Sequence, residues 1–186
     1  MDLVTGLLSS LGLSGAAGLN AYIPLLIVGG LNHFGVMHLA APYDLIADPW
    51  VMLAVGLLGA LDFVGDKIPG VDHVLHLVGG VVNTAAGAVL FAAQSGVAHV
   101  PPAVSLALGL IVAGGVHATR TAVRPVATAT TAGLGNPAFS LAEDASSLTL
   151  SVLAVFAPIL AVLGLAGFGV VAYRLYARFG RRRRAL

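Results

Sequence analysis

The sequence predicts an all-α fold, a polytopic bundle of membrane-spanning helices, and three observations support this. Hydrophobic residues make up 58% of the 186 residues and charged residues only 9%, and the mean hydropathy is +0.97. A soluble domain carries about 25% charged residues, so this chain has too few charges to cover a water-exposed surface. The apolar residues lie in long stretches, and one membrane span takes about 20 residues. We therefore expect one domain of about six spans, with broken or re-entrant helices.

Five long apolar stretches account for the predicted spans. They are residues 3–31, 45–65, 74–98, 102–118 and 145–177. The last stretch is too long for one span and contains Pro158, so it predicts two helices, at about 145–161 and 165–179. The first stretch is either one broken span or a re-entrant segment followed by a span. The bundle is expected to cover residues 1–179 and to leave a basic tail at 180–186.

Two short motifs predict the broken helices. AGLNAYIP at 17–24 places Asn20 and Pro24 in an apolar stretch, and AGLGNP at 132–137 places Asn136 before a second proline. Proline lacks an N–H and clashes with the carbonyl four residues earlier, so Pro24 would free the backbone oxygen of residue 20. Paired interruptions point to a transporter binding site, whereas two unrelated kinks are the alternative. A three-plus-three inverted repeat would fit the span count, although similar segments occur in opposite order.

Basic residues predict the orientation of the spans. The segments 66–73 and 119–144 and the C-terminal region from Arg174 onward contain every lysine and arginine, whereas the opposite loops at 32–44, 99–101 and 162–164 contain none. Cytoplasmic loops are enriched in these residues, so we expect a multi-pass membrane protein with both termini cytoplasmic. The arginine run at 181–184 would contact lipid phosphates. No nucleic-acid partner is expected, because no folded basic face accompanies the run.

Charged, histidine and amide side chains gather toward the expected cytoplasmic side. The candidate binding residues are Asn20, Asp62, Asp66, Lys67, Asp72, His117, Arg120, Arg124, Asn136, Glu143 and Asp144. His117, Arg120 and Arg124 are spaced by three and four residues, which places them on one helix face. A charge near the hydrocarbon costs a few kcal/mol and normally finds a partner inside the bundle. The group therefore predicts either a substrate or ion site, or ion pairs that only hold helix ends together.

Two local signals predict where the helices around this group begin and end. Pro125 is expected to stop the helix that carries Arg120 and Arg124. Ser140 and Glu143 have the spacing of a capping box, which predicts a helix start near residue 140.

A metal site is an alternative use of the acidic and histidine residues. Asp72, His73 and His76, together with Asp62 and Asp66, offer ligands suited to zinc, manganese or iron. The neighbouring Lys67 and the absence of a His-x3-His pattern argue against a dense cation site. The chain also lacks cysteine, which excludes thiolate ligands, so no cofactor is expected.

Four motifs, in this order, resemble an uncharacterised family of small bacterial integral membrane proteins catalogued as domain of unknown function 4126. They are GAAGLNAYIPLL, DKIPGVDH, the stretch from His117 to Arg124, and GNPAFSLAED. The resemblance covers roughly residues 10–165 and implies a polytopic protein of the bacterial inner (plasma) membrane, without a reaction or a substrate. The polar residues that recur in the family match here at Asn20, Asp66, Lys67, Asp72, His117, Arg124, Glu143 and Asp144.

The sequence favours a transporter or channel for an ion or a small anionic solute. Asp66 or Glu143 would take up a proton or cation, while Arg120 and Arg124 would hold an anion through forked hydrogen bonds. The alternatives are a membrane enzyme or binding protein that acts on a lipid phosphate, and a structural or accessory membrane protein. Catalysis is less favoured because the chain has no DDxxD or HExxH motif and no Ser-His-Asp set that can be placed. Its partners would be membrane lipids and, through glycine-rich helices, a second copy of the chain.

Overall fold

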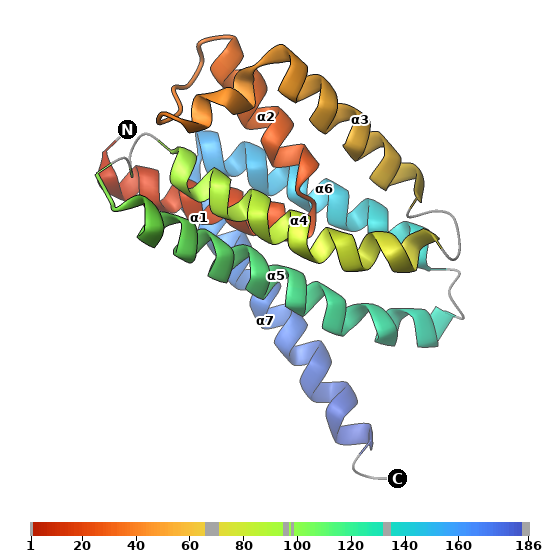
Figure 1. The fold of residues 1–186 in the computed structure, drawn as a ribbon. Coiled ribbons are helices and arrows are strands. Elements are labelled where there is room, and N and C mark those ends of the chain that lie inside the picture. Colours follow the sequence, from red (N-terminus) through yellow and green to blue (C-terminus); the bar gives the residue numbers. More distant parts are fainter. Residues whose placement is uncertain (1, 66–70, 95–96, 98, 132–134, 184–186) are drawn as a thin grey trace.

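The computed structural model describes residues 2–65, 71–94, 97, 99–131 and 135–183, and it confirms the predicted all-α bundle. Side chains are described in these ranges except at 71–77, 125–131, 172 and 175–183. This part of the chain forms seven α-helices and one short 3-10 helix (Figure 1). They are α1 (Leu3–Leu19), α2 (Tyr22–His33), η1 (Tyr43–Ala47), α3 (Pro49–Gly65), α4 (Val71–Ala93), α5 (Pro102–Thr131), α6 (Asn136–Phe156) and α7 (Pro158–Arg183).

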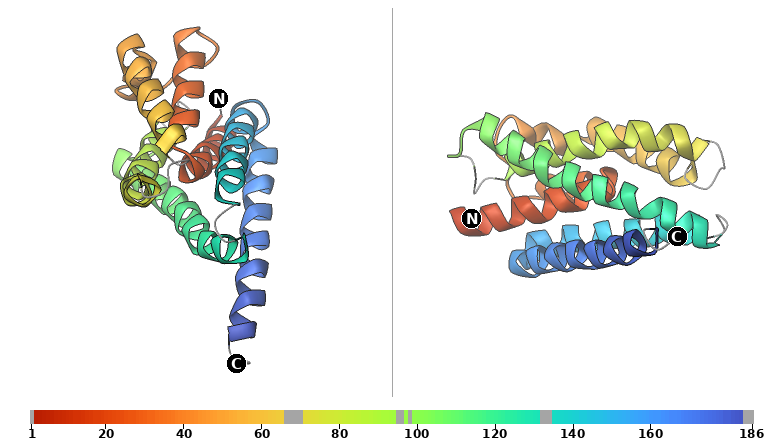
Figure 2. Two further views of the ribbon diagram at one scale, coloured as in Figure 1. Left: turned by 90° about the vertical axis from the view of Figure 1, so that its right-hand side faces the viewer. Right: turned by 90° about the horizontal axis from the view of Figure 1, so that it is seen from below.

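Helix α1 lies at the centre of the bundle and packs against α4, α5, α6 and α7 (Figures 1 and 2). Every residue from Gly12 to Leu19 is buried. A helix enclosed on all sides needs small residues, because they let neighbouring backbones approach closely. A Cβ atom added to Gly12 would lie 2.7 Å from the Cβ of Ala154, and one added to Gly18 would lie 2.7 Å from the Cβ of Val116.

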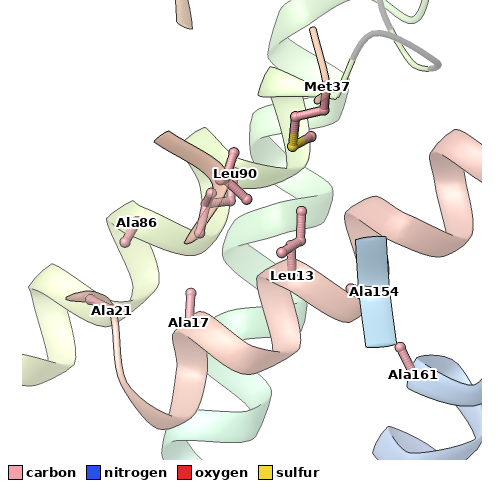
Figure 3. Close-up of a cluster of buried hydrophobic side chains, with 9 residues drawn as sticks. Leu13, Ala17, Ala21, Met37, Ala86, Leu90, Ala154 and Ala161 are labelled. Atoms are coloured by element: carbon pink, nitrogen blue, oxygen red, sulfur yellow. The ribbon is translucent and has the colours of Figure 1, made fainter. Parts of the chain in front are cut away.

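The main core is built from alanine and leucine side chains at these close contacts. Leu13 and Ala17 of α1 meet Ala86 and Leu90 of α4 on one side, and Ala154 of α6 on the other (Figure 3). Small and branched side chains of this kind fill the space between helices without polar atoms. The core therefore fixes α1 between α4 and α6.

Contacts along α1 show how the helices run. Ser10 donates to the carbonyl of Phe91, near the end of α4, and Ser14 donates to the carbonyl of Gly109, near the start of α5. Helix α1 is therefore antiparallel to α4 and parallel to α5. The start of α1 lies at the end of the bundle where α4 leads into α5, and the C-terminal part of α7 lies at the opposite end (Figure 2).

The first apolar stretch is a helical hairpin rather than a single broken span. Helix α2 begins near Asn83, where the amide of Ala21 donates to the Asn83 side chain. It then turns back from α1 and runs beside α3 (Figure 1). The segment after α2 returns to the end of α4, where the amide of Ala40 donates to the carbonyl of Ala93. Residues 3–31 thus supply two helices of opposite direction.

Three predicted helix boundaries were wrong. Helix α5 continues through Pro125 to Thr131, because a proline removes one backbone hydrogen bond and a packed helix tolerates that loss. Helix α6 already begins at Asn136, so Ser140 and Glu143 lie inside the helix and form no capping box. Helices α6 and α7 are separated at Ala157, directly before a proline that cannot donate to the preceding turn.

The surface and the helix lengths point to a membrane protein. In the described part of the chain, two segments are long and apolar enough to cross a bilayer, Pro102–Arg124 and Asn136–Phe156. Large apolar side chains also lie on the outside: on α3, Trp50, Leu57 and Leu61 are 78%, 59% and 66% exposed. Contiguous apolar surface of this kind is rare on a soluble monomer and is typical of contact with lipid or with another protein.

Candidate functional site

The break between α1 and α2 is built around the side chain of Asn20. The backbone of Asn20 is extended, with φ −149° and ψ 123°. Its Oδ1 accepts hydrogen bonds from the amides of Tyr22 (2.9 Å) and Ile23 (3.3 Å), which caps the start of α2. Its Nδ2 donates to Oδ1 of Asp144 on α6 at 2.8 Å. Pro24 lies in the first turn of α2. Backbone N–H groups in a first turn have no partner within the helix, so the missing N–H of proline costs nothing there.

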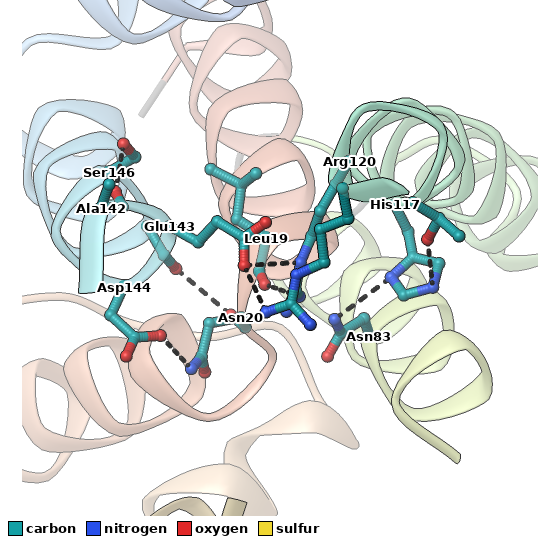
Figure 4. A network of polar contacts seen from close by, with 12 residues as sticks. Leu19, Asn20, Asn83, His117, Arg120, Ala142, Glu143, Asp144 and Ser146 are labelled. Atoms are coloured by element: carbon teal, nitrogen blue, oxygen red, sulfur yellow. Dashed lines mark hydrogen bonds and ion pairs between the residues drawn. The ribbon is translucent and has the colours of Figure 1, made fainter. Parts of the chain in front are cut away.

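Side chains from three other helices bind the backbone groups that the break exposes (Figure 4). The hydroxyl of Ser147 on α6 donates to the carbonyls of Ala16 (3.0 Å) and Asn20 (3.2 Å). Arg120 Nη1 on α5 donates to the carbonyl of Leu19. The Ala16 carbonyl also keeps its helical bond from the Asn20 amide. The contacts to the Leu19 and Asn20 carbonyls, together with the bond from the Ala21 amide to Asn83 of α4, replace hydrogen bonds that a continuous helix would have made.

Arg120 and Arg124 on α5 converge on a single carboxylate of α6. Oε2 of Glu143 lies 2.8 Å from Arg120 Nε and 3.0 Å from Arg124 Nη2. The contact with Arg124 is a hydrogen bond. The contact with Arg120 is an ion pair only, because the N–H of Arg120 Nε is not aligned with the carboxylate oxygen. The three side chains are 10%, 15% and 13% exposed, in the order Arg120, Arg124, Glu143. The group carries a net charge of +1 in a nearly buried position.

A cavity of about 210 Å³ lies beside this group, between α5, α6, α7 and the end of α1. Arg120, Arg124 and Glu143 contribute to its wall. The rest of the wall is mostly apolar and includes Leu19, Val123, Phe139, Ala142, Phe168 and Val171. The site therefore combines a small charged region with a larger apolar one.

His117 connects the same region of α5 to α4. Its Nδ1 lies 3.4 Å from Nδ2 of Asn83, and its Nε2 lies 3.4 Å from the hydroxyl of Thr121 (Figure 4). Since Asn83 also binds the amide of Ala21, one asparagine side chain joins the break to the histidine. Both sides of the break are thus linked to α5, through Asn83 and His117 on one side and through Arg120 on the other.

The family comparison covers all of these residues. The family described as domain of unknown function (DUF4126) matches residues 7–178. The chain belongs to this family. No curated protein and no solved structure matches the chain. The predicted resemblance is therefore confirmed, and the DUF4126 region includes the break, the two arginines and the cavity.

Six of the predicted site residues of this DUF4126 chain come together around the break. They are Asn20, His117, Arg120, Arg124, Glu143 and Asp144. Asn136 is the first residue of α6, two turns before Glu143. Asp62 is half-buried on α3 and interacts electrostatically with Tyr22 of α2, away from the two arginines.

The remaining predicted residues cannot be assigned to the site. Asp66 and Lys67 lie outside the described residues, and Asp72, His73 and His76 lie on the first turns of α4, where side chains are not described. Among the described side chains of this DUF4126 protein, no three acidic or histidine residues are grouped so that they could hold a metal ion.

Sequence reasoning missed two residues of the site. Asn83 is an isolated polar residue in an apolar stretch, VVNTAAG, and the argument that singled out Asn20 would also have found it. Ser147 stands among several serines and threonines of α6, and nothing in the sequence separates it from Ser146 or Thr149. Its role depends on which face of α6 meets α1.

Proposed function

We propose that this DUF4126 protein binds a small anionic solute at Arg120 and Arg124 and moves it through the membrane. The observation that carries the proposal is the convergence of both arginines on one carboxylate at the wall of a cavity. A nearly buried charge needs a partner, and arginine binds carboxylates and phosphates through paired hydrogen bonds. With one carboxylate between them, the two guanidinium groups retain a net attraction for an anion.

The arginines would play different parts in this function. Arg120 is held at the break by the Leu19 carbonyl, so it is the fixed cation. Arg124 reaches Glu143 through Nη2, and an entering anion would compete with that carboxylate for its N–H groups. Because Glu143 and Asp144 are adjacent on α6, a shift of the Glu143 side chain and its helix would be transmitted to Asn20 at the break.

The basic end of the bundle is proposed to face the cytoplasm of the bacterial inner membrane. Every lysine and arginine of the chain lies toward this end by sequence, as expected for the cytoplasmic side. The N-terminus would then lie on the other side of the membrane, which differs from the prediction of two cytoplasmic termini. The prediction counted residues 3–31 as one span, whereas α1 and α2 are two antiparallel helices. The chain then passes through the bundle an odd number of times, so its two ends lie on opposite sides. Lipid, and a second copy of the chain, would cover the apolar outer faces.

Charge movement in proteoliposomes tests the proposed transport. The purified protein would be exposed to concentration jumps of chloride, acetate and phosphate at fixed pH. We expect currents with at least one anion in the wild type and their loss in Arg124→Gln. The matched control is Arg174→Gln, an exposed arginine of α7 outside the cavity wall, which should retain the currents. Equal currents in wild type and Arg124→Gln would refute the role of this arginine.

A structural role is a second candidate, favoured by a specific observation. The side chains around the break are the ones that bind its exposed backbone groups, so they could serve only to hold the bundle together. In that case Glu143→Gln should lower the yield of folded protein, because it leaves both nearly buried guanidinium groups without their carboxylate. Adding Arg124→Gln should restore part of the yield, because one of the two unpaired charges is removed. Under the transport proposal, the double variant would fold and remain inactive.

A further inference from the structure

The cavity beside the arginines allows the substrate class to be narrowed. We propose that the anion bound by Arg120 and Arg124 carries an apolar chain: it is a single-chain anionic lipid whose phosphate or carboxylate head lies at the arginines. This inference rests on the proposed function, since it places the solute at the same two residues.

The first argument is the composition of the cavity wall. Phe139 and Phe168 contribute aromatic side chains and Val123 a branched one, while the charged groups lie at one part of the wall. A small inorganic anion would occupy the charged part and leave these side chains uncovered. An attached chain would bury them, which is favourable in proportion to the apolar area removed from water.

The second argument is the level of the arginines relative to the apolar helices. On α5 the apolar run from Leu106 to Val116 is followed by His117, Arg120 and Arg124, and on α7 the cavity residues Phe168 and Val171 are followed by Arg174. Arginines at the end of an apolar span lie where lipid headgroups lie. The polarity of the cavity therefore follows that of a lipid monolayer, with the charge at the headgroup level and the apolar wall on the hydrocarbon side.

The third argument is access from the side. Phe139 and Val171 line the cavity and are 38% and 58% exposed, so this part of the wall is open to the outside rather than enclosed. Helix α7 leaves the bundle toward its C-terminal end (Figure 1). The cavity is thus continuous with the apolar surface between the helices, and a lipid could enter it without passing through water.

Equilibrium binding in nanodiscs of phosphatidylcholine tests the inference, with dodecyl phosphate as the labelled probe and empty nanodiscs as the blank. Inorganic phosphate supplies the head without the chain, and dodecanol supplies the chain without the head. We expect dodecyl phosphate to bind at least about tenfold more tightly than either, since both parts of the site contribute.

Two variants separate the parts of the site. Arg124→Gln should weaken dodecyl phosphate about tenfold and leave dodecanol unchanged, because only the charged contact is lost. Val123→Trp fills the cavity and should weaken dodecyl phosphate while sparing inorganic phosphate. The controls are Arg174→Gln and Val152→Trp, an exposed valine of α6 outside the cavity wall, and both should bind as the wild type does.

The outcomes distinguish this inference from the proposed function. If inorganic and dodecyl phosphate bind equally and both depend on Arg124, the chain is not recognised and the anion site stands. If dodecanol binds as tightly as dodecyl phosphate, the headgroup is not recognised and the inference fails. If neither phosphate binds the wild type above the blank, the inference fails, and the proposed function then depends on the currents with chloride and acetate. Should Arg124→Gln not fold, equal binding of dodecyl phosphate to Val123→Trp and wild type overturns the inference.

Discussion

Asn20 Nδ2 donates to Asp144 Oδ1 at 2.8 Å, and so ties the break between α1 and α2 to helix α6. The oxygen of the same amide caps the start of α2. An asparagine can do both because its side chain carries a donor and an acceptor. Aspartate in its place would lose the donor to Asp144, and leucine would lose both contacts.

Exchanging the two side chains tests this relationship. Asn20→Asp alone keeps the acceptor for α2 but places a carboxylate against Asp144, and we expect it to lower the free energy of unfolding by about 1–2 kcal/mol. Adding Asp144→Asn restores the hydrogen bond in the opposite direction and should recover most of the loss. The measurement is unfolding in mixed micelles followed by circular dichroism. A double variant no more stable than Asn20→Asp would show that the pair is not coupled.

Ser147→Ala should be destabilising, whereas Ser146→Ala should not. The hydroxyl of Ser147 is buried and donates to the carbonyls of Ala16 and Asn20. Its removal leaves the Asn20 carbonyl at the break without this donor and should cost about 1–2 kcal/mol, whereas the Ala16 carbonyl keeps the bond from the Asn20 amide. The hydroxyl of Ser146 is bonded within its own helix, to the carbonyl of Ala142. The same unfolding experiment compares the two variants, and equal stabilities would contradict the role of Ser147 at the break.

A methyl group at Gly12 should disrupt the contact of α1 with α6 and α7. The added Cβ would lie 2.7 Å from Ala154 Cβ and 2.9 Å from Ala161 Cβ, so we expect Gly12→Ala to cost about 1–3 kcal/mol through overpacking. Gly167→Ala is the control, because nothing lies within 4 Å of its added Cβ. This control should be neutral or slightly more stable, since alanine favours the helix. Thermal unfolding in detergent distinguishes them, and an unchanged melting temperature in Gly12→Ala would contradict the close packing.

The proposed placement of the two termini on opposite sides of the membrane can be tested with single cysteines, because the chain has none of its own. We expect Asp2→Cys and His99→Cys to react with an impermeant maleimide from the periplasmic side of intact cells. Gly180→Cys should react only after the membrane is opened. Protection of Asp2→Cys together with labelling of Gly180→Cys would reverse the orientation, and equal behaviour of the two would mean that the termini share one side.

Part of the fold and of the site around Asn20 could be predicted from the sequence. The scarcity of charge predicted the all-α bundle, and Asn20 with its small neighbours marked the broken helix. The spacing of His117, Arg120 and Arg124 placed them on one face of α5. These predictions succeeded because they rest on the polarity of single helices, which composition and a period of 3.6 residues determine.

The partners of these residues were not predictable in the same way. That Glu143 serves both arginines depends on how α5 and α6 are aligned, and α1 controls this alignment by packing between α4, α5 and α6. The sequence did not decide between one broken span and two helices at residues 3–31. The whole stretch is apolar, and hydropathy does not show in which direction the second helix runs. The capping-box pattern at Ser140 failed because its glutamate pairs with distant arginines, a contact that local patterns do not contain.

The central position of α1 has a consequence for the order of synthesis. Helix α1 is made first, yet Ser10, Ser14 and the end of the helix find their hydrogen-bond partners on α4, α5 and α6, 81 to 131 residues later. A chain emerging from the ribosome must therefore carry this serine- and glycine-rich helix, with its partners still unmade, through most of translation. The core around α1 can therefore be completed only after α6 has been made.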